Sequence, residues 1–185
     1  MRAMLCRRYG APSVLRLETI DTPTPGPGEV RIDVNACGIN FADTLMISGK
    51  YQVRPAFPFS PGLEVAGRIG AVGEGVDRFQ IGDRVAALCT YGGYAEAVIA
   101  REAQCVAIPD AMDDVTAAGF IVTYGTSHVG LDHRVGLQPG ETLLVHGASG
   151  GVGITAVEIG KRMGATVIAT AGSDKKLTVP EKYGA

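Results

Sequence analysis

The chain has 185 residues, of which 46% are hydrophobic and 19% are charged, and its formal net charge is −2. This is the composition of a globular protein that can bury a core. The absence of a basic block argues against nucleic acid or an anionic membrane surface as a partner. No stretch reaches the ~18 apolar residues of a membrane span, and the N-terminus lacks the apolar core of a signal peptide.

The cysteines indicate a reducing compartment and no metal cluster. Cys6, Cys37, Cys89 and Cys105 form neither a C-x-x-C pair nor a zinc-type spacing. Buried, reduced thiols of this kind are typical of a cytoplasmic protein. We therefore expect a cytoplasmic location and no metal site.

The first half is predicted to be an all-β unit. Short runs of aliphatic and β-branched residues alternate with dense glycine and proline turns, which is typical of a barrel or a sandwich. We expect strands at 14–20, 29–36, 65–72 and 83–88, with a short helix at 40–47.

The second half, after Pro109, changes to alternating helix and strand. We expect one or two helices over 113–136, with a break near Gly125 or Gly130, and a last helix that starts at Ser173 and is kinked or shortened by Pro180. Between them, the pattern predicts a strand at 142–146, a glycine loop at 147–153, a helix at 154–163 and a strand at 166–171. This order is that of a parallel βαβ unit.

The glycine loop carries the strongest chemical signal, because it follows a predicted strand and opens a predicted helix. Small residues let the backbone approach a pyrophosphate, and the N–H groups and positive dipole at the helix start hold its charge. Gly153 would let the helix lie close to the first strand. A tight turn without a ligand is the alternative. The residues predicted to bind the cofactor here are Ala148, Ser149, Gly150, Gly151 and Val152.

The end of the second strand bears on the choice of coenzyme. An acid there would hold the ribose diol of NAD, whereas this chain has a small residue, Ala171 or Gly172, followed by Ser173 and two lysines. Hydroxyl donors and positive charge suit a 2′-phosphate, so the pattern favours NADPH over NADH. We expect Gly172, Ser173 and Lys176 in the site, although the lysines are also typical of a solvated helix face. Asp174 is interpreted as a first-turn acid that interacts with the helix dipole.

The chain resembles the quinone oxidoreductase (ζ-crystallin-like) branch of the medium-chain dehydrogenase/reductase superfamily. The family signature is similar to 140–144, 148–153 and Lys161, and Glu158 departs from it by standing where glutamine is usual. Similar segments occur in the first half at 38–43, 48–51, 61–67, 76–85 and 91–96. The resemblance implies a GroES-like β-barrel domain at 1–112, which is the catalytic domain. It also implies a partial α/β Rossmann domain at 113–185 that binds NADP and contains only the first βαβ unit.

The ligand types at two positions argue against a catalytic zinc. Zinc-dependent relatives place a cysteine where this chain has Asn40 and a histidine where it has Leu63, and neither amide nor leucine is a good Zn²⁺ ligand. Without a Lewis acid, the favoured substrates are those whose own conjugation spreads the incoming charge. We expect NADPH-dependent hydride transfer to quinones, with reduction of alkenal or enone double bonds as the alternative. His128, His133 and His146 have no carboxylate or cysteine pattern nearby and are interpreted as surface or packing residues.

The resemblance places Asn40 and Tyr51 beside the nicotinamide, where Asn40 would donate to a carbonyl oxygen and Tyr51 would offer a hydroxyl and an aromatic wall. A loop cap for Asn40 and simple packing for Tyr51 are the alternatives. Thr126 is expected to face the cofactor, or else to pack within its helix. The expected partner is a small quinone or α,β-unsaturated carbonyl, with a homodimer in the full-length protein.

A complete dinucleotide fold has six parallel strands, and this sequence supplies two. We therefore expect a truncated chain with exposed sheet edges and an under-covered apolar face. Alone it would be a poor catalyst, and a non-catalytic nucleotide-binding fragment is a further alternative.

Overall fold

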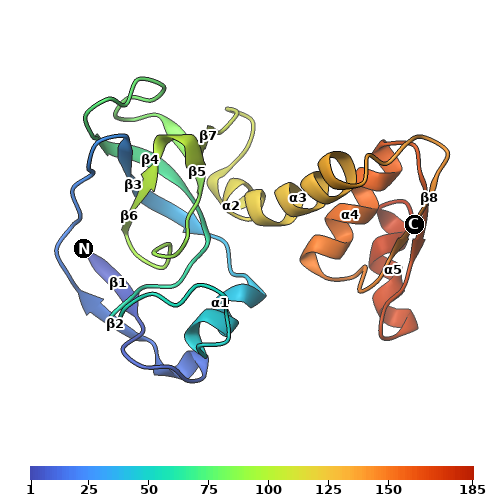
Figure 1. The fold of residues 1–185 in the computed structure, drawn as a ribbon, viewed down its shortest axis with the longest axis horizontal. Coiled ribbons are helices and arrows are strands. Elements are labelled where there is room, and N and C mark those ends of the chain that lie inside the picture. The colour runs from blue at the N-terminus through green and yellow to red at the C-terminus, as the bar shows by residue number, and fades with distance from the viewer. The chain divides into compact units, whose positions relative to one another are not determined.

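A computed structural model describes residues 1–185 and shows two units, Met1–Ile121 and Val122–Ala185. Unit 1 holds the antiparallel strands and unit 2 holds a small parallel sheet with its helices (Figure 1). The boundary expected at 112/113 stays a proposal. Helix α2 (Asp114–Ala118) packs on strands of unit 1, so the residues just after 112 lie with that unit.

The main sheet of unit 1 has five antiparallel strands in the order β6-β3-β4-β5-β7. β-Branched residues alternate along β3 so that Val30 and Ile32 are fully buried, as expected for a strand with one face on a core. Register shifts in the pairing of β3 with β4 bend the sheet, which curls into a half-barrel rather than a closed barrel. The strands are β3 (Glu29–Cys37), β4 (Glu64–Val72), β5 (Arg84–Leu88), β6 (Ala97–Arg101) and β7 (Cys105–Ala107).

Smaller elements complete unit 1. Strands β1 (Arg2–Leu5) and β2 (Arg16–Thr19) form an antiparallel pair, and isolated bridges join Ala3 to Ala95 and Cys6 to Phe59. Helix α1 spans Phe41–Ile47. Two short 3₁₀ turns, η1 (Pro12–Val14) and η2 (Glu102–Gln104), precede β2 and β7.

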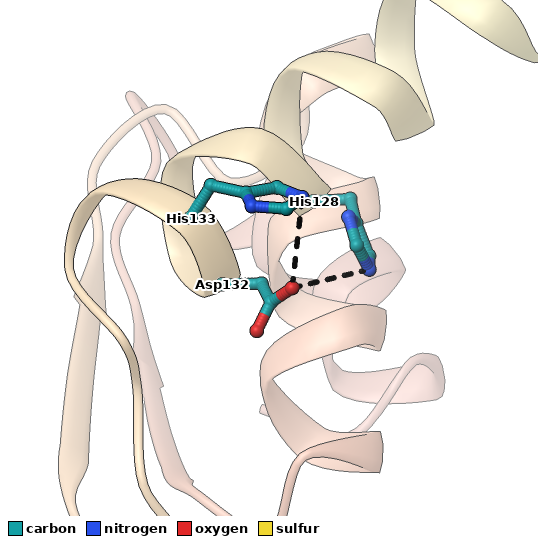
Figure 2. A group of neighbouring side chains, drawn as sticks. All are labelled: His128, Asp132 and His133. Atoms are coloured by element: carbon teal, nitrogen blue, oxygen red, sulfur yellow. Dashed lines mark ion pairs between the residues drawn. The ribbon is translucent and has the colours of Figure 1, made fainter.

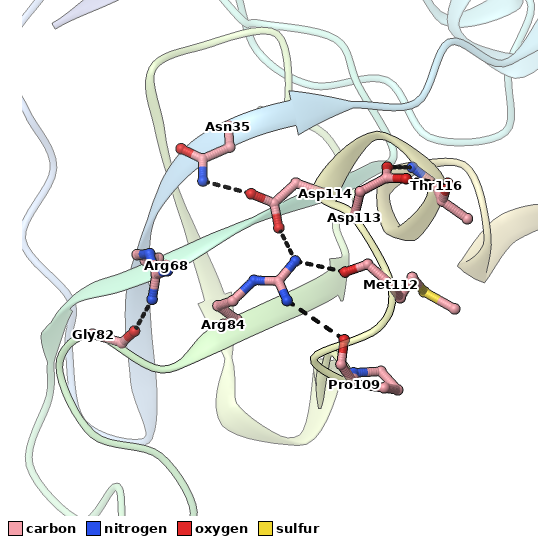
Figure 3. Close-up of polar contacts among 9 residues, drawn as sticks. All are labelled: Asn35, Arg68, Gly82, Arg84, Pro109, Met112, Asp113, Asp114 and Thr116. Atoms are coloured by element: carbon pink, nitrogen blue, oxygen red, sulfur yellow. Dashed lines mark hydrogen bonds and ion pairs between the residues drawn. The ribbon is translucent and has the colours of Figure 1, made fainter.

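A polar network fastens the start of α2 to the sheet of unit 1 (Figure 3). Arg84 on β5 contacts Asp114 at 2.6 Å, and Asn35 on β3 donates to the other carboxylate oxygen at 2.8 Å. The hydrogen bond from Arg84, followed by that from Asn35, lowers the pKa of Asp114. Asp113 caps the helix by accepting from the backbone N–H of Thr116 at 2.7 Å. These contacts explain why this helix belongs to unit 1.

Unit 2 is a βαβ arrangement preceded by helix. α3 (Ile121–His128) leads into η3, a π-helix over Val129–Arg134. β8 (Thr142–Val145) and β9 (Thr166–Ala169) pair in parallel, α4 (Gly151–Arg162) connects them, and α5 (Asp174–Lys182) follows. The core of the unit lies between the sheet and α4 and is centred on Val145, Val157 and Val167.

The opposite face of the parallel sheet is apolar and exposed. Leu144 and Ile168 are cross-strand neighbours, and they are 52% and 50% exposed. Their alternation with buried Val145 and Val167 follows from the two-residue period of a strand. The under-covered apolar face expected from the sequence is therefore present. No helix in either unit has the length and apolar character required to cross a bilayer.

The predicted elements of both halves are present, with differences at their ends. The four predicted strands of the first half, the helix at 40–47 and the βαβ order are confirmed. The helical segment at 113–136 breaks between α2 and α3, at 119–120, and not at Gly125, while Gly130 lies in the π-helix. Helix α5 continues through Pro180 and ends two residues later. Strands β1, β6 and β7 were not predicted.

Candidate functional site

The glycine bend of unit 2 connects β8 to the first turn of α4. Gly147 has a φ of +63°, a conformation that favours glycine. A Cβ on Gly153 would collide with the carbonyl oxygen of Gly147 and would lie 2.8 Å from the Cα of Ala148. Gly153 thus brings the helix against the bend itself. The close approach of α4 to the strand falls instead at Gly160, whose Cβ would collide with Leu143 of β8.

The start of α4 carries no capping side chain. Its N-cap is Gly150, and no side chain accepts a hydrogen bond from the first turn. The first N–H groups of a helix have no partner within the helix, and the positive end of the dipole lies at the same place. Gly150, Gly151 and Val152 are exposed, so side chains do not plug the bend. This is the geometry that receives an anion.

The end of β9 lies directly beside the glycine bend. The backbone N–H of Ala148 donates to the carbonyl of Thr170 at 2.9 Å, and the side chains of His146 and Thr170 are in hydrogen-bond contact at 2.9 Å. The parallel pairing of β8 and β9 brings both carboxyl ends to one edge. The structure therefore brings together the two segments that the sequence singled out, the bend at 147–153 and the segment at 170–173.

The residues after β9 are small and exposed. A Cβ on Gly172 would meet no atom within 4 Å, so the bend is open there. Ser173 is the N-cap of α5, and its side chain makes no capping bond. Lys175 and Lys176 are exposed in the first turn of that helix together with Asp174. A hydroxyl and two ammonium groups are therefore available at the end of the strand.

Two buried hydroxyl groups, which the sequence analysis did not identify, connect the first turn of α4 to α3. Ser127 on α3 donates to the carbonyl of Val152 at 2.9 Å and contacts the hydroxyl of Thr155 at 2.7 Å. Thr155 in turn donates to the carbonyl of Thr123 at 3.0 Å. Thr126, the residue expected to face the cofactor, is exposed one position before Ser127. The hydroxyl residues themselves are the only sequence signal for this contact, and Ser127 does not stand out, because α3 also contains Thr123, Tyr124 and Thr126.

Glu158, the position that departs from the family signature, joins α3 to α4. It accepts a hydrogen bond from the hydroxyl of Tyr124 at 2.6 Å and another from Arg162 at 3.0 Å. The bond from Tyr124 is the main cause that lowers the pKa of Glu158, and the same bond raises the pKa of Tyr124 to about 12. The carboxylate lies in the middle of α4 and serves helix packing.

Two acidic residues of unit 1, Asp43 and Glu64, are buried near the start of α1. Asp43 is 1% exposed and accepts from the backbone N–H of Gly62 at 3.0 Å, the backbone N–H of Asn40 at 2.8 Å and the hydroxyl of Tyr94 at 2.9 Å. Burial, followed by the nearby charge of Asp43, raises the pKa of Tyr94. Asp43 is thus a structural hub, in line with the first-turn acid of a capping box.

Asn40 and Tyr51 also lie in unit 1. Asn40 is the N-cap of α1, and its amide nitrogen donates to Glu64, which is 2% exposed, at 2.9 Å. Glu64 was not singled out by the sequence. Tyr51 is half-buried and its backbone N–H donates to the carbonyl of Leu45 at 3.2 Å.

The Cys37 thiol of unit 1 is not an activated nucleophile. Burial, followed by the charge of Asp43, raises its pKa to about 12.

Known proteins resemble the chain over its whole length. The alcohol dehydrogenase GroES-like domain matches residues 26–110. Quinone oxidoreductase from Lama guanicoe is 41% identical over 187 residues, which cover 100% of this chain and 57% of that protein. The crystal structure of Escherichia coli quinone oxidoreductase complexed with NADPH has a TM-score of 0.94 at 31% identity and covers 100% of this chain and 57% of that one. Residues 26–110 belong to the alcohol dehydrogenase GroES-like domain family, and the chain as a whole is similar to quinone oxidoreductases of the medium-chain dehydrogenase/reductase superfamily.

Within this superfamily, the similarity extends to an enzyme named for a different activity. The structure of CurK enoyl reductase matches with a TM-score of 0.90 at 34% identity, and covers 98% of this chain and 57% of that one. The chain spans about half the length of the curated relatives it matches. The parallel sheet of unit 2 is consistent with part of the superfamily's Rossmann domain, and the curled sheet of unit 1 is its GroES-like domain.

The prediction that no carboxylate lies near the histidines is wrong for two of the three. His128 and His133 have a carboxylate beside them, because both rings face Asp132, at 3.9 and 3.8 Å (Figure 2). The i,i+4 spacing of His128 and Asp132 could have indicated this contact, because residues four apart lie on the same face of a helix. All three side chains are exposed, so their placement on the surface agrees with the expectation.

Proposed function

We propose that this chain forms the catalytic and coenzyme-binding parts of an NADPH-dependent, zinc-independent reductase of quinones. One observation carries the proposal, namely the exposed, uncapped start of α4 in a bend that only small residues can form. The bend fits a pyrophosphate, since backbone N–H groups and the helix dipole meet there. Ser149, Gly151 and Val152 would offer their N–H groups to the two phosphates. The N–H groups of Ala148 and Gly150 already donate to the carbonyls of Thr170 and Gly147, so these two residues would line the bend.

Preference for NADPH rests on the residues after β9. Gly172 leaves room for the adenosine ribose, and Ser173 and Lys176 supply a hydroxyl and a positive charge for the 2′-phosphate. Charge-assisted hydrogen bonds of this kind are stronger than neutral ones. Asp174 lies in the same helical turn, but in the first turn it is favoured by the helix dipole.

When bound, NADPH supplies a hydride that, together with one proton, reduces a quinone to a hydroquinone. In this chain, Asn40 would donate one amide hydrogen to the substrate carbonyl while Glu64 holds the other at 2.9 Å. Tyr51 would provide an aromatic wall, and Thr126 would contact the cofactor. Asn40 and Leu63 replace the thiolate and imidazole that a catalytic zinc would need, so polarisation of the carbonyl falls to the amide.

The similarity to an enoyl reductase structure favours one second function, reduction of an enone or alkenal double bond. The two functions share the coenzyme site and differ in which atom receives the hydride. NADPH oxidation in the presence of a panel of quinones and enones separates them. If NADPH binds but is not oxidised with either class, the chain is a nucleotide-binding fragment and the reductase proposal fails for it.

Titration with NADPH and NADH, followed by cofactor fluorescence, tests the coenzyme assignment. Lys176→Ala should weaken NADPH binding by about 1–3 kcal/mol and leave NADH binding unchanged, because only NADPH has the 2′-phosphate. Lys175→Ala, which removes the same charge one position earlier, is the matched control and should have a smaller effect. Equal or tighter binding of NADH to the unaltered chain would contradict the assignment.

A further inference from the structure

The end of α3 and the π-helix that follows bring three metal-ligating side chains together. The Nε2 atoms of His128 and His133 face the same oxygen, Oδ2 of Asp132, at 3.9 and 3.8 Å (Figure 2). One ligand atom from each side chain lies within 4.8 Å of the other two. The cluster lies entirely in unit 2, whereas positions 40 and 63 lie in unit 1.

The π-helix is what creates this cluster. In an α-helix with 3.6 residues per turn, residues five apart point about 140° away from each other. In a π-helix, hydrogen bonds join residues five apart and place them on one face. The bond from the N–H of Val135 to the carbonyl of Gly130, at 3.2 Å, is of this kind. The wider turn therefore carries His133 to the side of His128, and their ring centroids are 5.8 Å apart.

The spacing suits a bridging cation better than direct contact. Both nitrogen–oxygen distances exceed the upper limit of about 3.2 Å for a good hydrogen bond, so Asp132 is not hydrogen-bonded to either ring. Around a tetrahedral Zn²⁺ with ligand bonds of about 2.0–2.1 Å, neighbouring ligand atoms lie about 3.4 Å apart. The exposed side chains would have to close by about half an ångström on the two short edges. The two imidazole nitrogens, which lie within 4.8 Å of each other, would have to close by at most about 1.4 Å.

We propose that His128, Asp132 and His133 form a surface site for a divalent cation of the zinc type. Two imidazoles and one carboxylate are ligands that Zn²⁺, Co²⁺ and Ni²⁺ accept, and they leave at least one position for water. Two of the three ligands are nitrogens, which disfavours Ca²⁺ and Mg²⁺ because these ions prefer oxygen ligands. The proposal departs from the expectation of no metal site and does not depend on the proposed reductase function.

A bound cation would lock the π-helix to the end of α3. Below the cluster, Leu131 and Leu137 are buried, and the N–H of Leu137 donates to the carbonyl of Leu131 at 2.8 Å. The N–H of Gly136 donates to the carbonyl of Asp132 at 3.0 Å, and Gly136 has a φ of +60°. The metal ligand Asp132 is therefore part of the turn that ends the helix. Binding to the folded state alone would raise its stability.

The test is titration of the chain, with any affinity tag removed, with Zn²⁺ by calorimetry and with Co²⁺ by its ligand-field absorption. We expect one saturable equivalent and a rise in the unfolding temperature with Zn²⁺. His128→Gln, Asp132→Asn and His133→Gln should each weaken binding at least tenfold and should remove the thermal shift, because loss of even an outer-shell partner of a metal site costs about tenfold or more.

His146→Gln is the matched control, because it removes the third histidine of the chain from outside the cluster, and it should retain full binding. The altered side chains are exposed, and circular dichroism will confirm that each variant folds. The proposal is overturned if no saturable binding occurs. It is equally overturned if a variant that combines all three substitutions still binds one equivalent of Zn²⁺, since the cysteines or other groups would then be the ligands.

Discussion

The two units of this chain use their polar groups in opposite ways. In unit 1, the buried carboxylate of Asp43 is surrounded by three donors from its own unit, and no buried side-chain nitrogen or oxygen in the chain lacks a partner. In unit 2, the first turn of α4 starts at Gly150 without a capping side chain. Buried groups that satisfy one another maintain a fold, whereas exposed donors left free are suited to a ligand.

The largest effect is expected at the hub of unit 1. Asp43→Ala leaves the N–H groups of Gly62 and Asn40 and the hydroxyl of Tyr94 without their acceptor. Each unpaired buried group costs about 1–3 kcal/mol, so the free energy of unfolding should fall by at least about 3 kcal/mol in urea titrations. Asp33→Asn, which alters an exposed ion pair with Arg31, should change it by less than about 1 kcal/mol. Similar effects from both variants would contradict the structural role of Asp43.

A smaller effect on stability and a larger one on ligand binding are expected in unit 2. Gly153→Ala forces a Cβ against the backbone of Gly147 and Ala148. We expect a loss of about 1–3 kcal/mol of stability from overpacking and at least a tenfold loss of NADPH affinity, measured by cofactor fluorescence.

Gly125→Ala is the matched control for this substitution. Its Cβ would meet no atom within 4 Å in the interior of α3, so stability should rise by about 0.5–1 kcal/mol with NADPH binding retained. If Gly153→Ala binds NADPH as tightly as the unaltered chain, the contrast between the two units fails.

The smallest effect is expected at the contact between α3 and α4. Tyr124→Phe removes the hydrogen bond to Glu158 and should cost about 1–2 kcal/mol near neutral pH. The pKa of Glu158 is lowered from its ordinary 4.5, so this stabilisation is present above that value and is lost as the pH falls below it. The pKa of Tyr124 is raised from 10 to about 12, so the stabilisation is also lost as the pH rises across this range.

Urea unfolding across pH is the measurement for Tyr124→Phe. The difference between the unaltered chain and the variant should be greatest near neutrality and should shrink at both extremes. Tyr9→Phe, which keeps the ring contact with Phe57, should be nearly neutral at every pH. A difference that does not change with pH would show that the hydroxyl of Tyr124 acts through packing alone.

Much of the fold could be predicted because its signals are local. The strands at 29–37 and 64–72 have buried β-branched residues at alternate positions, and the βαβ order follows from glycine and hydrophobic patterning. Strands β1, β6 and β7 have between three and five residues. Their pairing is long-range, as in the pairing of Ile32 on β3 with Val98 on β6, and no local pattern encodes it.

The backbone segments of the candidate site were predicted from the sequence, but the buried polar side chains that hold them in place were not. The bend at 147–153 and the segment at 170–173 were identified because small residues at a strand end have few other uses. Ser127, Thr155 and Glu64 were missed, since a single polar residue in a helix or strand does not reveal that it is buried. The cluster at His128 was missed because the register of a π-helix follows from tertiary packing and not from spacing.

The bond from the N–H of Ala148 to the carbonyl of Thr170 has a consequence for engineering the coenzyme preference. It ties together two loops that would hold neighbouring groups of the nucleotide, the pyrophosphate and the 2′-phosphate, so a change of backbone in one displaces the other. Exchanges at positions 172–176 should then show epistasis with exchanges at 147–150, with double variants departing from the sum of the single ones. A switch of coenzyme in this protein is better selected from libraries that vary both loops at once.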